Sequence, residues 1–242
     1  MVKNNSMFLN VEKTKVMMFG SQKKLRQGTI NLHTNDGQLE VVHNFKYLGV
    51  ILDSGLKWTK QTENVVSKIS RIIVVIRKIK YYVTKENLID LYYSLILPYI
   101  DYCIVIWGNT SRTNLTKIQR VQNRYARIVL NESIYCSSSY LLSTLNWQSI
   151  TKRIEFQQCL MVYKILHNRL PSYLNRLISN RPVYYSTRYA INSPLFVPTP
   201  RTEYMKHSLS FKGSSVFNKL PFSVQSSPSL DIFRKQCRII LS

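Results

Sequence analysis

The chain has 242 residues, of which 45% are hydrophobic and 12% aromatic, so it can bury a core and is not a disordered polypeptide. It carries 34 Lys and Arg residues against 12 Asp and Glu residues, which gives a formal net charge of +22. Such an excess indicates a polyanionic partner, with nucleic acid as the first candidate and an anionic membrane surface as the second. The four cysteines lie far apart, which argues against a zinc site or a disulfide framework and favours buried thiols in a reducing compartment.

Residues 1–56 have the pattern of a β-rich region. The predicted strands are Lys15–Phe19, Thr29–Leu32, Leu39–Val42 and Phe45–Leu52. Asn35-Asp36-Gly37 predicts a hairpin between the middle two strands. We expect Phe45–Leu52 to be one strand with apolar side chains on both faces, in which Gly49 permits a bulge or a close backbone approach.

Two helices are predicted next. The first covers about residues 60–80, and its apolar residues recur every three or four positions while Lys68, Arg71 and Lys78 fall on another face. Thr84 is the expected N-cap of the second helix. The apolar run from Leu91 to Trp107 contains Ser94, Pro98 and Asp101, so we interpret it as a buried helix broken at Pro98 rather than a membrane span. No membrane partner is expected.

A third helix is predicted from about Arg112 to Leu130. Its basic residues repeat by three, four and three positions, and they are Lys117, Arg120, Arg124 and Arg127. The segment contains no Asp or Glu, so these residues form a basic ridge that suits phosphate contacts. The alternative is an ordinary solvated helix face.

Residues 131–242 are predicted to be mostly helical. Ser149 is the expected cap of a helix from Ile150 to about Asn168, and a short helix follows at Tyr173–Ile178. The stretch from Asn180 to Arg201 has the composition of an extended arm or linker. We expect a hairpin-like segment at residues 201–220 and a last helix from Ser229.

The acidic residues do not predict a catalytic or metal site. The aspartates, Asp36, Asp53, Asp90, Asp101 and Asp231, are all far apart in sequence, and the histidines lie away from cysteines and carboxylates. Asp101 is expected to be a buried carboxylate satisfied by an Arg or a Tyr hydroxyl. Aromatic and basic residues interleave at Lys78–Tyr82 and Arg181–Arg188, which fits either stacking on single-stranded nucleic acid or a core of tyrosines.

Several motifs resemble one family when they are taken in order. Phe45-Lys46-Tyr47-Leu48-Gly49-Val50-x-Leu52-Asp53, followed by Leu56-x-Trp58, resembles the palm–thumb junction of reverse transcriptases from non-LTR retrotransposons of the jockey and CR1 type. Upstream, Leu9-Asn10-x-x-Lys13-Thr14 is similar to a palm motif of that family. The thumb-like and tail-like motifs are Leu91–Cys103, Trp107-Gly108, Leu115–Arg124, Tyr185–Arg188, Val197–Glu203 and Phe217–Pro221.

The resemblance implies an α+β chain: a small β-rich remnant of a polymerase palm at residues 1–56, a helical thumb at 57–130, and a basic, mostly helical C-terminal region at 131–242. It implies that template–primer RNA or DNA is the partner, that Lys13 lies near the incoming nucleotide, and that the chain is intracellular, in the nucleus or the cytoplasm. The catalytic aspartates and their Mg²⁺ would belong to sequence preceding Met1, so we expect this chain alone to have no cofactor and no polymerase activity. The alternatives are a free-standing basic helical RNA- or DNA-binding protein and a non-functional remnant of a mobile element.

Overall fold

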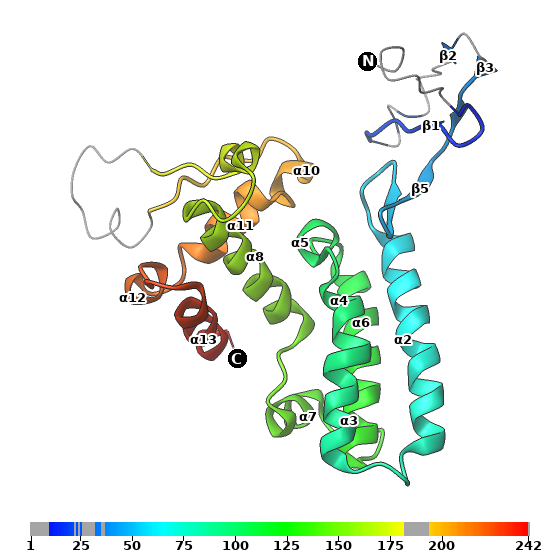
Figure 1. Cartoon of the computed structure of the whole chain (residues 1–242), viewed down its shortest axis with the longest axis vertical. Helices are drawn as coiled ribbons and strands as arrows, with labels where there is room; N and C mark the ends of the chain where they lie inside the picture. The colour runs from blue at the N-terminus through cyan, green and yellow to red at the C-terminus, as the bar shows by residue number, and fades with distance from the viewer. Residues whose placement is uncertain are drawn as a thin grey trace. The chain divides into compact units, whose positions relative to one another are not determined.

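The computed structural model describes residues 10–21, 23, 25, 32–34, 37–181 and 194–241. The chain divides into two compact units, residues 1–61 and residues 62–242, which are described separately below. Helices dominate and the sheets are small (Figure 1), so the α+β class is confirmed. The assignment of these parts to a palm, a thumb and a C-terminal region stays a prediction.

Three two-stranded sheets make up the described part of the N-terminal unit. Their strands are β1 (Lys15–Val16), β2 (His33–Thr34), β3 (Gly37–Gln38), β4 (Glu40–Val41), β5 (Asn44–Tyr47) and β6 (Val50–Asp53). β1 pairs with β4 in parallel, whereas β2–β3 and β5–β6 are antiparallel. The pairing of β2 with β3 is the antiparallel arrangement expected around the Asn-Asp-Gly turn, although Asn35 and Asp36 themselves lie outside the described residues.

The prediction of one strand at Phe45–Leu52 was wrong, because β5 and β6 form a hairpin. Tyr47 pairs with Val50, which leaves Leu48 and Gly49 as a two-residue turn with φ angles of 45° and 84°. Positive φ at both turn residues matches the right-handed twist of the flanking strands. Gly49 therefore supplies a turn and not a bulge, and β5 is exposed rather than buried.

Asp53 organises the chain immediately after this hairpin. Its Oδ1 accepts hydrogen bonds from the backbone N–H groups of Gly55 (3.2 Å) and Lys57 (2.9 Å), and its Oδ2 accepts one from Trp58 (2.7 Å). Leu56 and Trp58 have positive φ angles of 49° and 62°, so these bonds hold an unfavourable backbone in place. The Leu-Asp-x-x-Leu-x-Trp motif is therefore a structural joint, with the Trp58 side chain buried.

Helix α2 (Thr59–Ile79) confirms the first predicted helix, and it is followed by α3 (Lys85–Leu91), η2 (Tyr92–Ile96) and α4 (Leu97–Asp101). Thr84 caps α3 as predicted, since its hydroxyl accepts from the N–H of Asn87. The predicted break at Pro98 was wrong: helical backbone continues through it to Asp101. The π-helical turn of η2 widens the helix before Pro98, which lets the chain tolerate the missing N–H of proline.

The actual break comes at Cys103, which has left-handed φ and precedes α5 (Ile104–Trp107). Gly108 directly follows α5. A Cβ on this residue would lie 2.4 Å from the carbonyl oxygen of Ile104 and 3.1 Å from Cγ1 of Ile154, so only glycine fits there. Helix α6 (Arg112–Leu130) then begins at Ser111, whose hydroxyl accepts from the N–H of Asn114. Its bounds are those predicted.

The remaining helices are α7 (Ser138–Leu145), α8 (Ile150–Leu166), the 3₁₀ helix η3 (Ser172–Leu177), α10 (Glu203–Lys206), α11 (Leu209–Phe217), α12 (Phe222–Gln225) and α13 (Leu230–Ile240). The cap predicted at Ser149 and the last helix predicted from Ser229 are confirmed. The hairpin predicted at residues 201–220 was wrong, because Thr202 and Ser208 cap the helices α10 and α11. Residues 182–193 of the predicted arm lie outside the described residues.

The C-terminal helices share a core in which Phe156, Tyr163, Phe217 and Phe233 are almost fully buried. The Tyr163 and Phe233 rings stack with their centroids 4.3 Å apart, which ties α8 to α13. Within the described ranges, no helix combines the length and the apolar character needed to cross a bilayer.

Candidate nucleic-acid interface

Helices α2 and α6 run in the same direction and are joined by side-chain bonds. The Lys117 ammonium lies 3.6 Å from the Glu63 carboxylate. Seven residues further along both helices, Arg124 Nη2 donates to Ser70 Oγ at 2.8 Å. Because a step of seven residues is close to two helical turns, the same edge of each helix faces the other at both points.

The four predicted ridge residues on α6 differ in how free they are. Arg120 is exposed and makes no hydrogen bond or ion pair with any described residue, whereas Lys117 is half-buried and paired with Glu63. Arg124 and Arg127 are half-buried, and each has a buried Nε with no partner among the described residues. Burial, and then the positive charge of Arg77, lowers the pKa of Arg124 from its ordinary value. Arg127 Nη2 donates to the carbonyl oxygen of Cys136 at 3.1 Å, so it anchors the loop after α6.

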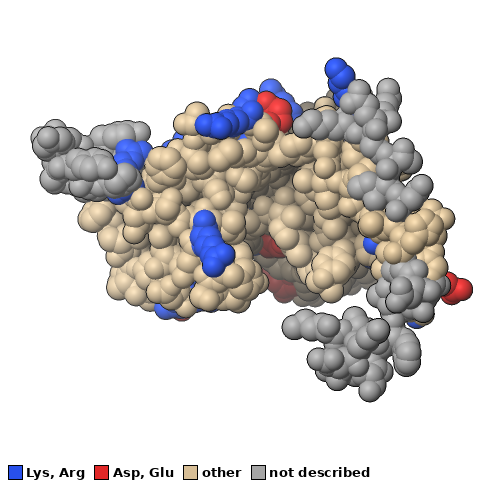
Figure 2. Space-filling model, turned by 90° about the horizontal axis from the view of Figure 1, so that it is seen from above, with Lys and Arg blue, Asp and Glu red and all other residues tan. Residues whose placement is uncertain are grey.

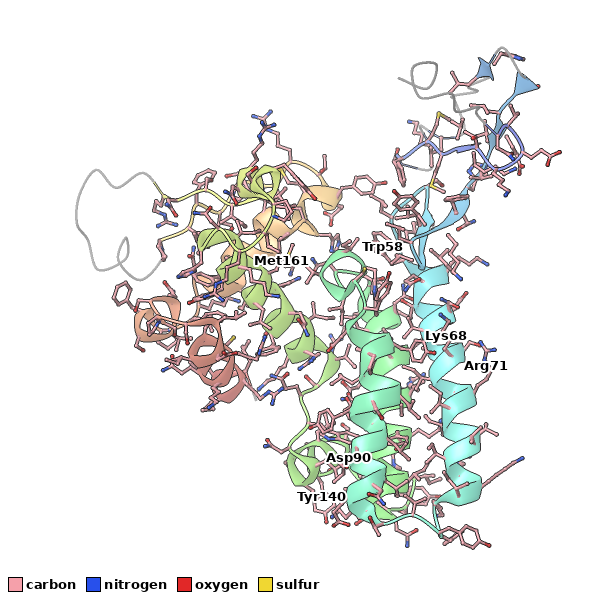
Figure 3. All side chains as sticks on the ribbon, viewed as in Figure 1. Trp58, Lys68, Arg71, Asp90, Tyr140 and Met161 are labelled. Atoms are coloured by element: carbon pink, nitrogen blue, oxygen red, sulfur yellow. The ribbon has the colours of Figure 1, made fainter. Side chains whose placement is uncertain are left out.

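The three predicted residues on α2 also divide into anchored and free groups. The Lys68 ammonium lies 5.2 Å from the centre of the Tyr99 ring on α4, and its side chain is half-buried. Arg71 and Lys78 are exposed, with no hydrogen bond or ion pair to any described residue. Figure 3 shows Lys68 and Arg71 on successive turns of α2.

Of the seven predicted residues, the free cations are therefore Arg71, Lys78 and Arg120. Glu63 is the single carboxylate on α2, and α6 has none. On the face seen in Figure 2, Lys and Arg side chains and a few Asp and Glu side chains lie on a surface that is mostly uncharged. Rigid helices that carry cations without neighbouring carboxylates can follow a phosphate backbone, because nothing on the protein competes for their charge.

Lys13 lies in the N-terminal unit, in a turn closed by Asn10. The Asn10 side-chain oxygen accepts from the backbone N–H of Lys13 at 3.0 Å, and its carbonyl oxygen accepts from the Thr14 hydroxyl at 2.7 Å. These bonds explain why Asn and Thr stand at those positions of the motif. The Lys13 side chain is exposed, and its predicted proximity to a nucleotide stays a prediction.

The described carboxylates do not form a set that fits the paired metal ions of a polymerase. Asp53 is occupied by backbone N–H groups, Asp231 pairs with Arg234, and Asp90 is an exposed residue of α3. Over the described ranges, no three His, Cys, Asp or Glu residues come together as metal ligands. Asp36 lies outside the described residues.

Asp101 has an arginine partner, as expected, but this arginine lies on α8 and not within residues 57–130 of the predicted thumb. Arg153 Nε donates to Asp101 Oδ1 at 2.9 Å, and its Nη2 bonds Oδ2, so the pair is bidentate. Burial by itself lowers the pKa of Arg153. The hydrogen bond to Asp101 and the negative charge of that carboxylate outweigh the effect of burial, so the pKa of Arg153 is raised above its ordinary value. The pair links the end of α4 to α8, which gives Asp101 a structural role.

A buried polar network reinforces the same junction. Gln122 Nε2 donates to the Tyr92 hydroxyl at 2.9 Å and to the carbonyl oxygen of Gln148 at 3.0 Å. Burial raises the pKa of Tyr125 to about 12, so its hydroxyl stays protonated and donates to the carbonyl oxygen of Leu88 at 2.7 Å. These contacts hold α6 against η2, α3 and the start of α8.

Sequence reasoning missed Ser70 and Arg77, the residues of α2 that meet Arg124. The signal was present, because Glu63, Ser70 and Arg77 recur every seven residues and so share one edge of the helix. It also missed Tyr135, which is 90% exposed in the loop after α6.

Two curated proteins are similar to the chain. The RNA-directed DNA polymerase from mobile element jockey of Drosophila funebris is 26% identical over 150 residues, which are 59% of this chain and 15% of that protein. The probable RNA-directed DNA polymerase from transposon X-element of Drosophila melanogaster is 24% identical over 142 residues, which are 55% of this chain and 14% of that protein. The chain is related to the reverse transcriptases of non-LTR retrotransposons.

That relationship confirms the resemblance inferred from the motifs. The alignments span only about 15% of the length of each curated relative. No protein-family model and no solved structure matches the chain.

Proposed function

We propose that the chain is the C-terminal part of a non-LTR retrotransposon RNA-directed DNA polymerase and that it grips template–primer nucleic acid through α2 and α6. The similarity to the jockey and X-element polymerases supports the class of protein. The observation that carries the grip is that three of the predicted residues on these two linked helices, Arg71, Lys78 and Arg120, are exposed and unpaired among the described residues.

The other four cations have a second role in this proposal. Lys68, Lys117, Arg124 and Arg127 are tied to Tyr99, Glu63, Ser70 and Cys136, so they fix the positions of the helices while adding positive charge nearby. Lys117 keeps some freedom, because an ion pair at 3.6 Å between partly exposed side chains stabilises by about 0–1 kcal/mol and yields readily to a phosphate.

The chemical step is assigned to residues outside this chain. The described aspartates accept backbone hydrogen bonds, form ion pairs or lie at an exposed helix position. This arrangement supports a role of the chain in binding nucleic acid rather than in coordinating two metal ions. Mg²⁺ is accordingly expected for the whole polymerase and not for this chain alone.

Lysine footprinting tests the location of the grip. The full chain is acetylated with and without an RNA–DNA hybrid, and each lysine is quantified by mass spectrometry. We expect the hybrid to protect Lys78, while Lys235, which is also exposed and lies on α13, keeps its reactivity. Protection of Lys235 without protection of Lys78 would place the binding face elsewhere and overturn the proposal.

A further inference from the structure

Three tyrosines project into solvent at two helix ends. Tyr81 and Tyr82, in the turn between α2 and α3, are 81% and 89% exposed, and Tyr135, in the loop between α6 and α7, is 90% exposed. We call these three residues the tyrosine tip. The sequence left open whether Tyr81 and Tyr82 belong to a core, and their exposure shows that they do not.

Both loops of the tyrosine tip are held in place. The backbone N–H of Tyr82 donates to the carbonyl oxygen of Ile79 at 2.9 Å, and that of Tyr135 donates to Ser133 Oγ at 3.2 Å. Lys80 Nζ donates to Asn131 Oδ1 at 3.3 Å, which joins one loop to the end of α6. Figure 1 shows the α2–α3 turn and the end of α6 at the same end of this helix group. A backbone held in this way loses little conformational freedom when the loops bind a ligand.

Positive charge surrounds these rings. The Lys80 ammonium lies 4.6 Å from the centre of the Tyr81 ring, and Lys78 is exposed one helical turn away on α2. Residues 77–86 and 127–137 together contain five Lys and Arg residues against two carboxylates, Glu86 and Glu132. Exposed aromatic rings beside cations are the combination that binds single-stranded nucleic acid, because bases stack on the rings while phosphates meet the cations.

We propose that the tyrosine tip stacks on unpaired bases of a single-stranded segment of RNA or DNA, with Lys78 and Lys80 on the adjacent phosphates. This inference rests on the proposed function and narrows its ligand to a strand with exposed bases. An anionic lipid surface also attracts lysines, but loops and helices that enter membranes present Trp, Phe and Leu, and the three rings here are all tyrosine. Duplex nucleic acid offers no free base faces to them.

The test measures the affinity of the full chain for a 12-nucleotide single strand and for a duplex of the same sequence. Replacing all three tyrosines by alanine should weaken single-strand binding by about fivefold or more per ring, since stacking contributes about 1–3 kcal/mol per base. Duplex binding and the salt dependence should stay unchanged, because no charge is removed. The corresponding phenylalanine variants should bind within about twofold of the wild type, and so should Tyr173→Ala, a control at a tyrosine that is 68% exposed on η3.

A second variant reports stacking directly. The three tryptophans, Trp58, Trp107 and Trp147, are buried, so Tyr82→Trp introduces an exposed indole whose fluorescence a stacked base should quench. No quenching, together with unchanged single-strand affinity in the alanine variant, would overturn the proposal. Equal losses for single strand and duplex would also overturn it. So would vesicles of phosphatidylcholine and phosphatidylserine that bind the wild type and not the alanine variant while single-strand affinity is unchanged.

The two proposals fail in different ways. If the wild type binds nucleic acid with Lys78 protected and the tyrosine variants have no effect, only the stacking inference is wrong. If the wild type shows no protection of Lys78, the grip through α2 and α6 is itself wrong.

Discussion

Replacing the free cations Arg71, Lys78 and Arg120 with glutamine should flatten the salt dependence of nucleic-acid binding. Each contact with a phosphate of a single strand releases counterions and contributes about 0.7 to the slope of log affinity against log salt. Three contacts therefore contribute a slope of about two. Over a fourfold rise in salt, the wild type should lose about 16-fold more affinity than the triple variant. Glutamine preserves helix propensity, and none of the three side chains bonds a described residue, so the fold should be unaffected.

A control variant that loses the same number of positive charges elsewhere on the chain separates specific phosphate contacts from the effect of net charge. A net charge of +22 attracts any polyanion, so the comparison is with a chain in which Arg169, Arg176 and Lys235 are replaced by glutamine. Both triple variants lose two arginines and one lysine from exposed positions. Fluorescence anisotropy at several salt concentrations gives the slope for each. Equal slopes in the two triple variants would refute the assignment of phosphate contacts to α2 and α6.

Three further predictions follow from the structure. The purified chain should extend no primer with Mg²⁺ or Mn²⁺, because its described carboxylates do not form a two-metal site; extension that one Asp substitution abolishes would contradict this. Leu48→Asn should raise the free energy of unfolding, measured by urea titration, by about 1 kcal/mol. Leu48 is 74% exposed and has a φ of 45°, where leucine is strained and asparagine is favoured. A loss of stability would show that Leu48 has a packing role. A thiol reagent should modify the half-buried Cys103 and Cys136 in the native state but not Cys159 and Cys237, which are fully buried. The hydrogen bond to Cys237 and burial raise the pKa of Cys159 and disfavour its thiolate. Four reactive thiols in the absence of urea would contradict this prediction.

Local signals predicted the long helices well. Thr84 and Ser149 were predicted as caps from their positions before a helical pattern, and each caps a helix in the structure. The apolar spacing of α2 and α6 likewise decided which face is buried. These features depend on neighbours three or four residues away, so the sequence alone is sufficient to predict them.

The failures come from backbone conformations that composition does not fix. Leucine rarely adopts positive φ, so Leu48-Gly49 lacked the sequence of a two-residue turn and was predicted as strand. Pro98 was predicted to break a helix, but the π turn of η2 accommodates it. Residues 201–220 were predicted as a hairpin, but they form two short helices whose caps are Thr202 and Ser208.

The periodicity of the sequence predicted which helix face carries each candidate site residue, but it could not predict which residues of other segments contact that face. Arg124 and Arg127 belong to the same predicted ridge as Arg120, yet Ser70 and the Cys136 carbonyl oxygen engage them. Ser70 is 54 residues from Arg124 in the chain, so no local pattern in α6 indicates the contact. The same holds for the tyrosine tip, because the hydrogen bond from Lys80 to Asn131 that links its two loops joins residues 51 positions apart in the chain.

Residues of the motifs that resemble reverse transcriptases have structural roles in this chain. Asp53 holds the backbone that leads into α2, Asn10 closes the turn at Lys13, and Gly108 leaves room for Ile104 and Ile154. None of these roles needs a substrate or a metal. The Asp53 joint fixes the backbone conformation of the residues that come directly before α2. Such structural motifs are compatible with the proposed function, in which this chain binds the phosphates of the nucleic acid and residues outside it carry out catalysis.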